Sequence, residues 1–296
     1  MYASPFEYAA ATSWEEAVRL LTEAGEDAKV IAGGQSLVPM MTLRLATPQM
    51  LVDVNRVSSE SIRHDDGHLV IPALTRHAEL QNSPVVRRWS PILSEAAGFI
   101  GNVRVRHRGT IGGSLAHADP AAELPTALVA LRGSVDVRGP AGERTVPAAD
   151  FFVTHFTTAL EPAEVVTAVG VPVMREGQGG AFVELARRAG DFALVEAAAL
   201  VDLEEDRRRC SGVRLALGAV GERPFDASEL AASLVGAEPS EDTVAEVALA
   251  ATRAVEPSSG VHGSAEYRRQ MVAVVVTRAL LAAIRRARRP EGEAVG

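Results

Sequence analysis

The chain has 296 residues, a length that favours two domains or three small ones over a single core. Hydrophobic residues make up 47% and charged residues 23% of it, as in an ordinary globular protein, and the formal charge of −8 argues against a nucleic-acid partner held through phosphate contacts. The single cysteine, Cys210, excludes an intrachain disulfide framework and a cysteine-ligated iron–sulfur cluster, and it favours a reducing compartment, the cytoplasm.

The first elements along the chain are a helix, a strand and a glycine turn. Ser13 and Glu16 form a capping box that predicts the start of the helix, and Gly25 predicts its end. Residues 29–32 read as a strand that leads into Gly33 and Gly34, with a short helical turn after them. This order, and the absence of GxGxxG spacing, argue against a Rossmann unit.

The rest of the chain reads as a series of strands and helices. Strands are expected at 51–54, 68–74 and 164–171, a hairpin at 134–138 with 144–146, and a helix over 80–98 punctuated by Pro84 and Pro91. A glycine-rich stretch at 176–180 marks the best domain boundary. Beyond it the pattern predicts three strands (181–186, 193–203, 213–220) and three helices (226–235, 240–255, 264–286).

The chain offers no signal for a membrane or secretion. The N-terminus lacks a basic region followed by an apolar stretch, so we expect no signal peptide. The apolar stretch 271–284 is too short to span a bilayer and predicts a buried C-terminal helix. The basic cluster that follows it reads as a solvated helix end: Arg285, Arg286, Arg288 and Arg289.

Two glycine pairs are the main candidates for a binding site. Glycine lets backbone N–H groups approach a ligand, and a turn of successive N–H donors makes a nest for an anion. Either pair alone is explained by a tight turn, but two with the same pattern indicate one ligand with two phosphates. The candidate residues are Ala32, Gly33, Gly34, Gln35, Ser36 and Leu37 in the first segment, and Thr110, Ile111, Gly112, Gly113 and Ser114 in the second.

Further polar residues surround the second pair. His117 and Asp119 have no second His or Cys at ligand spacing, so structural hydrogen bonding is favoured over a metal or acid–base role. Glu123 begins a helix, where it either complements the helix dipole or accepts hydrogen bonds from a cofactor. We predict no metal site and no catalytic residue, because motifs for nucleophilic, phosphoryl-transfer and zinc chemistry are absent.

A second polar loop precedes the second strand of the C-terminal region. It is either a polar loop with a turn at Gly190-Asp191 or a cofactor contact, with Phe192 against a flat ring and Arg188 near the ring's edge. Asp191 is a further candidate for a cofactor contact.

These motifs together resemble the flavin subunit of the molybdenum hydroxylases. The resemblance rests on Ala32–Met41 with Arg44-Leu45, on Thr110–Ser114 with Ala116–Pro120, on Arg187–Phe192 and on Ser264–Arg269, in the family's order. It covers essentially the whole chain.

The resemblance implies an α+β fold like that of vanillyl-alcohol oxidase. A PCMH-type FAD-binding domain is expected over 1–176, in subdomains of about 1–56 and 57–176. A C-terminal α+β domain like that of the carbon monoxide dehydrogenase flavoprotein, with a three-stranded sheet and helices, is expected over 177–287, and a flexible tail over 288–296.

The resemblance also implies where FAD is held. Residues 32–36 and 110–114 would hold its pyrophosphate. Glu123 stands where xanthine dehydrogenases carry an aspartate near the flavin, Phe192 where the carbon monoxide enzymes usually carry a tyrosine, and Ser114 where asparagine is common.

The implied function is electron transfer within a larger complex. The chain would pass electrons from two [2Fe-2S] clusters of a small partner subunit through FAD to an external acceptor, while a large molybdopterin subunit oxidises the substrate. A dimer of heterotrimers is expected. The alternatives are a standalone NADH oxidase or diaphorase and a scaffold without flavin. Carbon monoxide, a purine or an N-heterocycle as substrate, and oxygen, a quinone or NAD as acceptor, all remain open.

Overall fold

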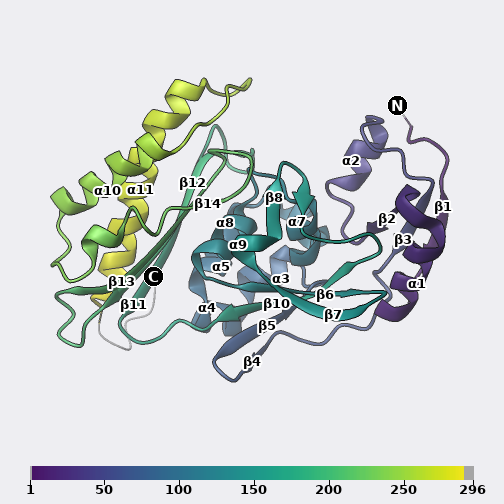
Figure 1. Cartoon of the computed structure of the whole chain (residues 1–296), viewed down its shortest axis with the longest axis horizontal. Helices are drawn as coiled ribbons and strands as arrows, with labels where there is room; N and C mark the ends of the chain where they lie inside the picture. The colour runs from purple at the N-terminus through teal and green to yellow at the C-terminus, as the bar shows by residue number, and fades with distance from the viewer. Residues whose placement is uncertain (1, 290–296) are drawn as a thin grey trace.

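The computed structural model describes residues 2–289, which form three units that follow one another along the chain (Figure 1). The N-terminal unit is a parallel sheet of order β1–β3–β2, with β1 at Glu7–Ala10, β2 at Ala28–Ile31 and β3 at Met50–Asp53. Helix α1 (Trp14–Ala24) packs on this sheet through Ala17, Val18 and Leu21. A 3-10 turn, η1 (Gly25–Asp27), leads from it into β2.

The start of α1 differs in one bond from the predicted capping box. Ser13 Oγ accepts from the Glu16 N–H at 3.1 Å as expected. The Glu16 carboxylate, however, accepts from the backbone N–H of Thr12 at 2.7 Å rather than from that of Ser13. Gly25 ends the helix in a left-handed conformation with φ of 68°, which glycine adopts without a Cβ penalty.

The middle unit contains an antiparallel sheet of order β4–β5–β10–β6–β7. Its strands are β4 (Arg63–Asp65), β5 (His68–Pro72), β6 (Ser134–Gly139), β7 (Gly142–Pro147) and β10 (Val165–Pro172). Between β5 and β6 lie α3 (His77–Asn82), α4 (Pro84–Trp89), α5 (Pro91–Phe99), α6 (Val103–Arg108), α7 (Ile111–His117) and α8 (Glu123–Ala130). Between β7 and β10 lie α9 (Ala148–Phe151) and a hairpin of β8 (Phe152–Thr154) with β9 (Thr157–Thr158).

The predicted helix over 80–98 is three short helices. Pro84 and Pro91 each occupy the first turn of a new helix, where the N–H that proline lacks would have no intrahelical partner. The two prolines, which the sequence indicated as interruptions of one helix, therefore separate three short helices.

The C-terminal unit is an antiparallel sheet covered by two long helices. The predicted strands are β11 (Gln178–Ala186), β12 (Ala193–Leu203) and β13 (Cys210–Gly218), and a two-residue strand that was not predicted, β14 (Phe225–Asp226), makes it four-stranded. The helices are α10 (Glu241–Ala254) and α11 (Ala265–Ala287).

The predicted helix over 226–235 is wrong. That segment holds the end of β14, turns and a 3-10 turn, η2 (Ala232–Leu234). Asp226 Oδ1 accepts from the Ser228 N–H at 3.0 Å, and Ser228 Oγ accepts from the Leu215 N–H at 3.2 Å. These side-chain bonds to the backbone compete with helix formation.

The C-terminal sheet is buried on both faces. Helices α10 and α11 cover one face, and α5 and α8 of the middle unit pack against the other (Figure 1). Arg286 of α11 joins the helices of the two faces, because it forms a 2.7 Å ion pair with Glu95 of α5 and also donates to the Gly180 carbonyl of β11. Arg286 is therefore an inter-unit tie and not part of a solvated helix end.

Helix α11 is the buried helix expected from residues 271–284, with Val275, Val276 and Leu280 in the core. None of the helices among residues 2–289 is long and apolar enough to cross a membrane. From residue 290 onward the predicted tail lies outside the described residues.

Candidate functional site

A cavity of about 940 Å³ lies where the three units meet, at the upper end of the size range of small-molecule sites. It is lined by both glycine segments and by Gly190–Phe192 of the loop between β11 and β12. All the predicted site residues line it except Ile111 and Arg188. The Ile111 side chain packs in the core of the middle unit, and Arg188 is exposed, its carbonyl accepting from the Asp191 N–H at 3.1 Å.

The first glycine segment connects β2 to α2 (Leu37–Thr42) and presents unused donors to the cavity. Among the described residues, the N–H groups of Gly34, Gln35 and Ser36 have no acceptor within the chain. Gly34 has φ of 70°, the left-handed region, and the Gln35 amide donates back to the Gly33 carbonyl at 3.1 Å. This segment can therefore bind an anion through successive main-chain N–H groups.

Gly33 also brings the two glycine segments into contact. A Cβ at this position would meet the Arg108 carbonyl oxygen and would lie 2.7 Å from Gly109 Cα. Such approaches are shorter than real Cβ atoms make, so only glycine allows the two backbones to touch here.

Two residues that the sequence reasoning missed hold this contact together. The Arg76 guanidinium donates to the Arg108 carbonyl and, at 2.7 Å, to Asn55 Oδ1. The Asn55 amide in turn donates to the Ala32 carbonyl at 2.8 Å. Asn55 follows β3 and Arg76 precedes α3, so nothing in the local sequence of either residue points to the glycine segments.

The second glycine segment uses its N–H groups inside the protein. Those of Ile111, Gly112 and Gly113 donate to the Thr75 carbonyl (3.0 Å), the Ala73 carbonyl (2.9 Å) and Thr110 Oγ1 (3.1 Å). Gly112 allows a close approach, because a Cβ there would lie 2.6 Å from that of Ala73. This segment therefore lines the cavity with small side chains, including the Ser114 hydroxyl, and not with free N–H groups.

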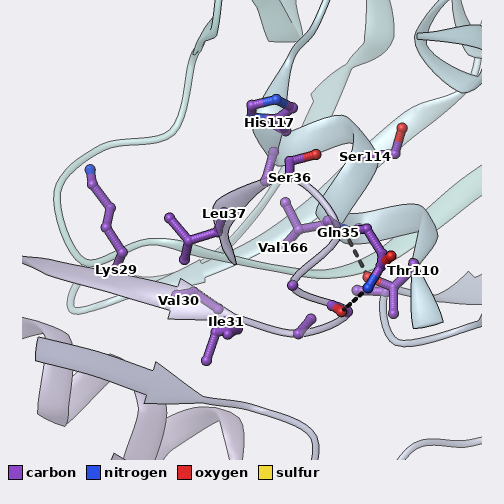
Figure 2. Close-up of a pocket in the computed structure, with 18 of the residues that line it drawn as sticks. Lys29, Val30, Ile31, Gln35, Ser36, Leu37, Thr110, Ser114, His117 and Val166 are labelled. Carbon is purple, nitrogen blue, oxygen red and sulfur yellow. Dashed lines mark hydrogen bonds between the residues drawn. The ribbon is translucent and has the colours of Figure 1, made fainter. Parts of the chain in front are cut away.

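Figure 2 shows how the side chains of the two segments meet. Gln35 and Ser36 lie beside Thr110, Ser114 and His117, while Lys29 stands apart on the other side of Leu37. Lys29 was also missed by the sequence reasoning, and its ammonium adds a cation to the lining.

His77 is a buried polar group at the edge of the cavity. It is 5% exposed, and neither ring nitrogen has a hydrogen-bond partner among the described residues. Burial lowers the pKa of His77 to about 4, so its ring is neutral at physiological pH and has one donor and one acceptor free. Both ring nitrogens lie below the surface of the cavity wall, so His77 contributes an unsatisfied polar group to the wall and no accessible contact to a ligand.

Glu123 and Phe192 face the cavity from different units. Glu123 is the first residue of α8, and burial, followed by the nearby Glu184 and Asp119, raises its pKa to about 8. Phe192 is 69% exposed although it is a large apolar ring, which suits a residue that covers a flat ligand. His117 packs on Phe156 at a centroid distance of 5.0 Å rather than pairing with Asp119.

One wall of the cavity comes from residues 156–158 and 160–166, which no motif marked. These residues carry no glycine pattern or charge cluster, so only the fold brings them here. Within residues 2–289, no group of three or more His, Cys, Asp or Glu side chains is arranged to hold a metal ion.

Comparison with known proteins connects this cavity to a family. Residues 4–174 match the family described as the FAD binding domain in molybdopterin dehydrogenase, and residues 180–283 match the CO dehydrogenase flavoprotein C-terminal domain. The chain is 44% identical to 6-hydroxypseudooxynicotine dehydrogenase complex subunit alpha of Paenarthrobacter nicotinovorans, over 96% of each chain.

Solved structures agree with these matches. A chain of the carbon monoxide dehydrogenase of Hydrogenophaga pseudoflava matches with a TM-score of 0.94 and 39% identity, covering 97% of this chain and 99% of that one. A chain of quinoline 2-oxidoreductase from Pseudomonas putida 86 matches with a TM-score of 0.93 and 38% identity, covering 98% and 100%.

Proposed function

Because this chain belongs to the family of FAD-binding medium subunits of molybdenum hydroxylases, we propose that it passes electrons from a partner's [2Fe-2S] clusters through FAD to an external acceptor. The protein is thus an oxidoreductase subunit. The observation that carries the proposal is a single cavity lined by both glycine segments, with unused N–H donors on one side and Phe192 on another.

The residues present fit the dinucleotide. The free N–H groups of Gly34, Gln35 and Ser36 suit a pyrophosphate, and the contact at Gly33 holds the backbone of the second segment against the first. When bound, FAD supplies the redox chemistry, accepting electrons one at a time and releasing them singly or in pairs.

This chain's own residues bind and orient the cofactor in the proposed function. The first glycine segment holds the phosphates, together with Thr110, Gly112, Gly113, Ser114 and Leu37 of the lining. Phe192 covers the flat ring, with Asp191 beside it, while Ile111 and Arg188 do not line the cavity. Glu123 supplies a carboxyl that is protonated at neutral pH.

The assembly follows from the same proposal. A chain with one cysteine has too few thiolates for the clusters, so they belong to a small subunit and the molybdopterin to a large one. We propose a dimer of such heterotrimers in the cytoplasm. We also propose the division into a FAD-binding domain at 1–176, with subdomains meeting near residue 56, and a C-terminal domain at 177–287.

Purification of the native assembly tests this function. We expect the chain to co-purify with iron–sulfur and molybdopterin subunits, and its flavin absorption at about 450 nm to bleach when the clusters are reduced anaerobically. A chain that purifies alone with flavin and oxidises NADH would support the diaphorase alternative instead. A native chain without flavin would refute both.

A further inference from the structure

The loop that carries Phe192 packs on the connection between α5 and α6. This loop, residues 187–192, joins β11 to β12. Its last residues, Gly190–Phe192, line the cavity, and so does Gly101 of the α5–α6 connection. A Cβ on Gly190 would lie 2.7 Å from the Gly101 carbonyl oxygen, closer than real Cβ atoms approach another atom. The backbones of the C-terminal and middle units therefore touch at these two glycines.

Both glycines lie in turns whose shape is set locally. Gly190 has φ of 83° and is the third residue of a turn that is closed by the hydrogen bond from the Asp191 N–H to the Arg188 carbonyl. Gly101 has φ of 45° and directly precedes Asn102, whose side chain caps the first turn of α6. The contact between the two units therefore joins two turns that are each held by their own hydrogen bonds.

Arg106 of α6 holds the carbonyl oxygen on which the loop packs. Its Nη1 donates to the Gly101 carbonyl at 3.0 Å and to the Ile100 carbonyl at 2.9 Å. Hydrogen bonds from a charged donor are stronger than those between neutral groups, so these bonds restrain the α5–α6 connection. Arg106 is half-buried and does not belong to the cavity lining. Any effect of this side chain on a ligand therefore passes through the Gly101 carbonyl.

These contacts lead from α6 to the ring of Phe192. Arg106 fixes the Gly101 carbonyl, Gly190 packs on that carbonyl, and Phe192 follows Gly190 by two residues. The Phe192 side chain is 69% exposed, so it has little packing of its own to hold it in place. The position of the ring at the cavity therefore depends on where the backbone of the loop rests.

We propose that Arg106 is a positioning residue that keeps Phe192 over the flat ring of FAD by holding the Gly101 carbonyl against Gly190. The inference rests on the proposed function, in which Phe192 covers that ring. While the contact between Gly101 and Gly190 is made, the loop is in place and the aromatic side chain limits access to the ring. When the contact is lost, the loop is free to move and the ring is open to molecules from solvent.

Quenching of the bound flavin's fluorescence by iodide tests the proposal. The full chain is saturated with FAD, and the quenching constant is measured at constant ionic strength. In Arg106→Met we expect this constant to rise about three- to tenfold, because the loop leaves its place for a larger fraction of the time. Loss of a positive charge by itself would make the approach of iodide less favourable, so the charge change does not account for a rise.

A double substitution separates positioning of Phe192 from a general effect on the fold. Phe192→Ala removes the aromatic side chain, and we expect it to raise the quenching constant by about the same factor as Arg106→Met. Arg106→Met added to Phe192→Ala should give no further rise, because no aromatic ring is left for the loop to position. A substitution that merely loosened the structure would raise the quenching constant in both backgrounds.

Two further variants complete the experiment. Gly190→Ala disturbs the same contact from the loop side, because the new Cβ would meet the Gly101 carbonyl, and it should also raise the quenching constant. Arg104→Met is the matched control, since it removes an exposed arginine from the same helix, and it should not raise the constant above that of the wild type.

The outcomes distinguish the inference from the proposed function. A wild-type quenching constant in FAD-loaded Arg106→Met, or an equal rise in the Phe192→Ala background, overturns the positioning role alone. If Arg106→Met does not bind FAD, a wild-type constant in Gly190→Ala overturns it instead. A wild-type chain that binds no FAD overturns the proposed function, and a Phe192→Ala chain quenched like the wild type overturns the covering role of Phe192. The positioning role fails with either result.

Discussion

Substituting Gly33 by alanine should separate the two glycine segments and weaken flavin binding. The new Cβ would lie 2.7 Å from Gly109 Cα, whereas an ordinary van der Waals contact is 3.4–4 Å, so the backbones must part by at least about 0.7 Å. The obstructing atoms are backbone, including the Arg108 carbonyl that Arg76 holds in place. Overpacking of this kind costs about 1–3 kcal/mol. If the strain falls on the cavity, the dissociation constant of FAD rises about 10- to 100-fold.

The assay is flavin content after purification, followed by titration of the flavin-free chain with FAD. Gly221→Ala is the matched control, because no atom lies closer than 3.9 Å to a Cβ at that position and its φ is not left-handed. We expect Gly221→Ala to bind FAD as the wild type does. Wild-type affinity in Gly33→Ala, with the fold intact, would refute the reasoning that contact between these two backbones shapes the site.

Four other substitutions test the remaining contacts. Arg76→Met removes the donors that join the two glycine segments and should lower FAD affinity about tenfold, measured by the same titration. Phe192→Ala should raise the FAD dissociation constant about 2- to 10-fold. It should change the free energy of unfolding by less than about 0.5 kcal/mol, because the ring is exposed. A large decrease in the free energy of unfolding, measured by chemical denaturation, would contradict this. Arg286→Met leaves Glu95 half-buried without its cation and should cost about 2 kcal/mol in the same denaturation assay, with no effect on the flavin spectrum. Glu184 has a folded-state pKa of about 7, above the ordinary 4.5, so the free energy of unfolding should fall as the pH rises from 4.5 to about 7 and beyond. Glu184→Gln should remove about 2 kcal/mol of this decrease above pH 8 and almost nothing at pH 4. Parallel curves of unfolding free energy against pH for the two proteins would contradict this prediction.

The two glycine segments that line the cavity were identifiable from sequence because their chemistry is local. Gly34 requires a left-handed conformation in a turn between a strand and a helix, and the residues around it carry the information for that turn. The family motifs then pointed to the cofactor. The sequence did not show that the second segment uses its N–H groups inside the protein. The acceptors of the Ile111 and Gly112 N–H groups, at Thr75 and Ala73, lie more than thirty residues earlier in the chain.

Long-range contacts explain why the sequence did not identify Asn55 and Arg76 as residues of the site. Asn55 and Arg76 became part of the site only because β3 and α3 pack beside the glycine segments. The helix expected over 226–235 failed for a different reason: Asp226 and Ser228 satisfy backbone groups locally and across the sheet, which helix propensity does not include.

The sequence by itself determined the order of most elements, because turn chemistry, capping and hydrophobic periodicity act over a few residues. The class of the protein and its cofactor followed from the resemblance of its motifs to a known family. Only the tertiary structure decided which polar groups share one buried environment. Glu184 and Glu196 are neighbours through strand register, and Glu123 joins them through the packing of α8 on the sheet. Their raised pKa values come from burial and from mutual proximity, and the sequence alone encodes neither in any local pattern.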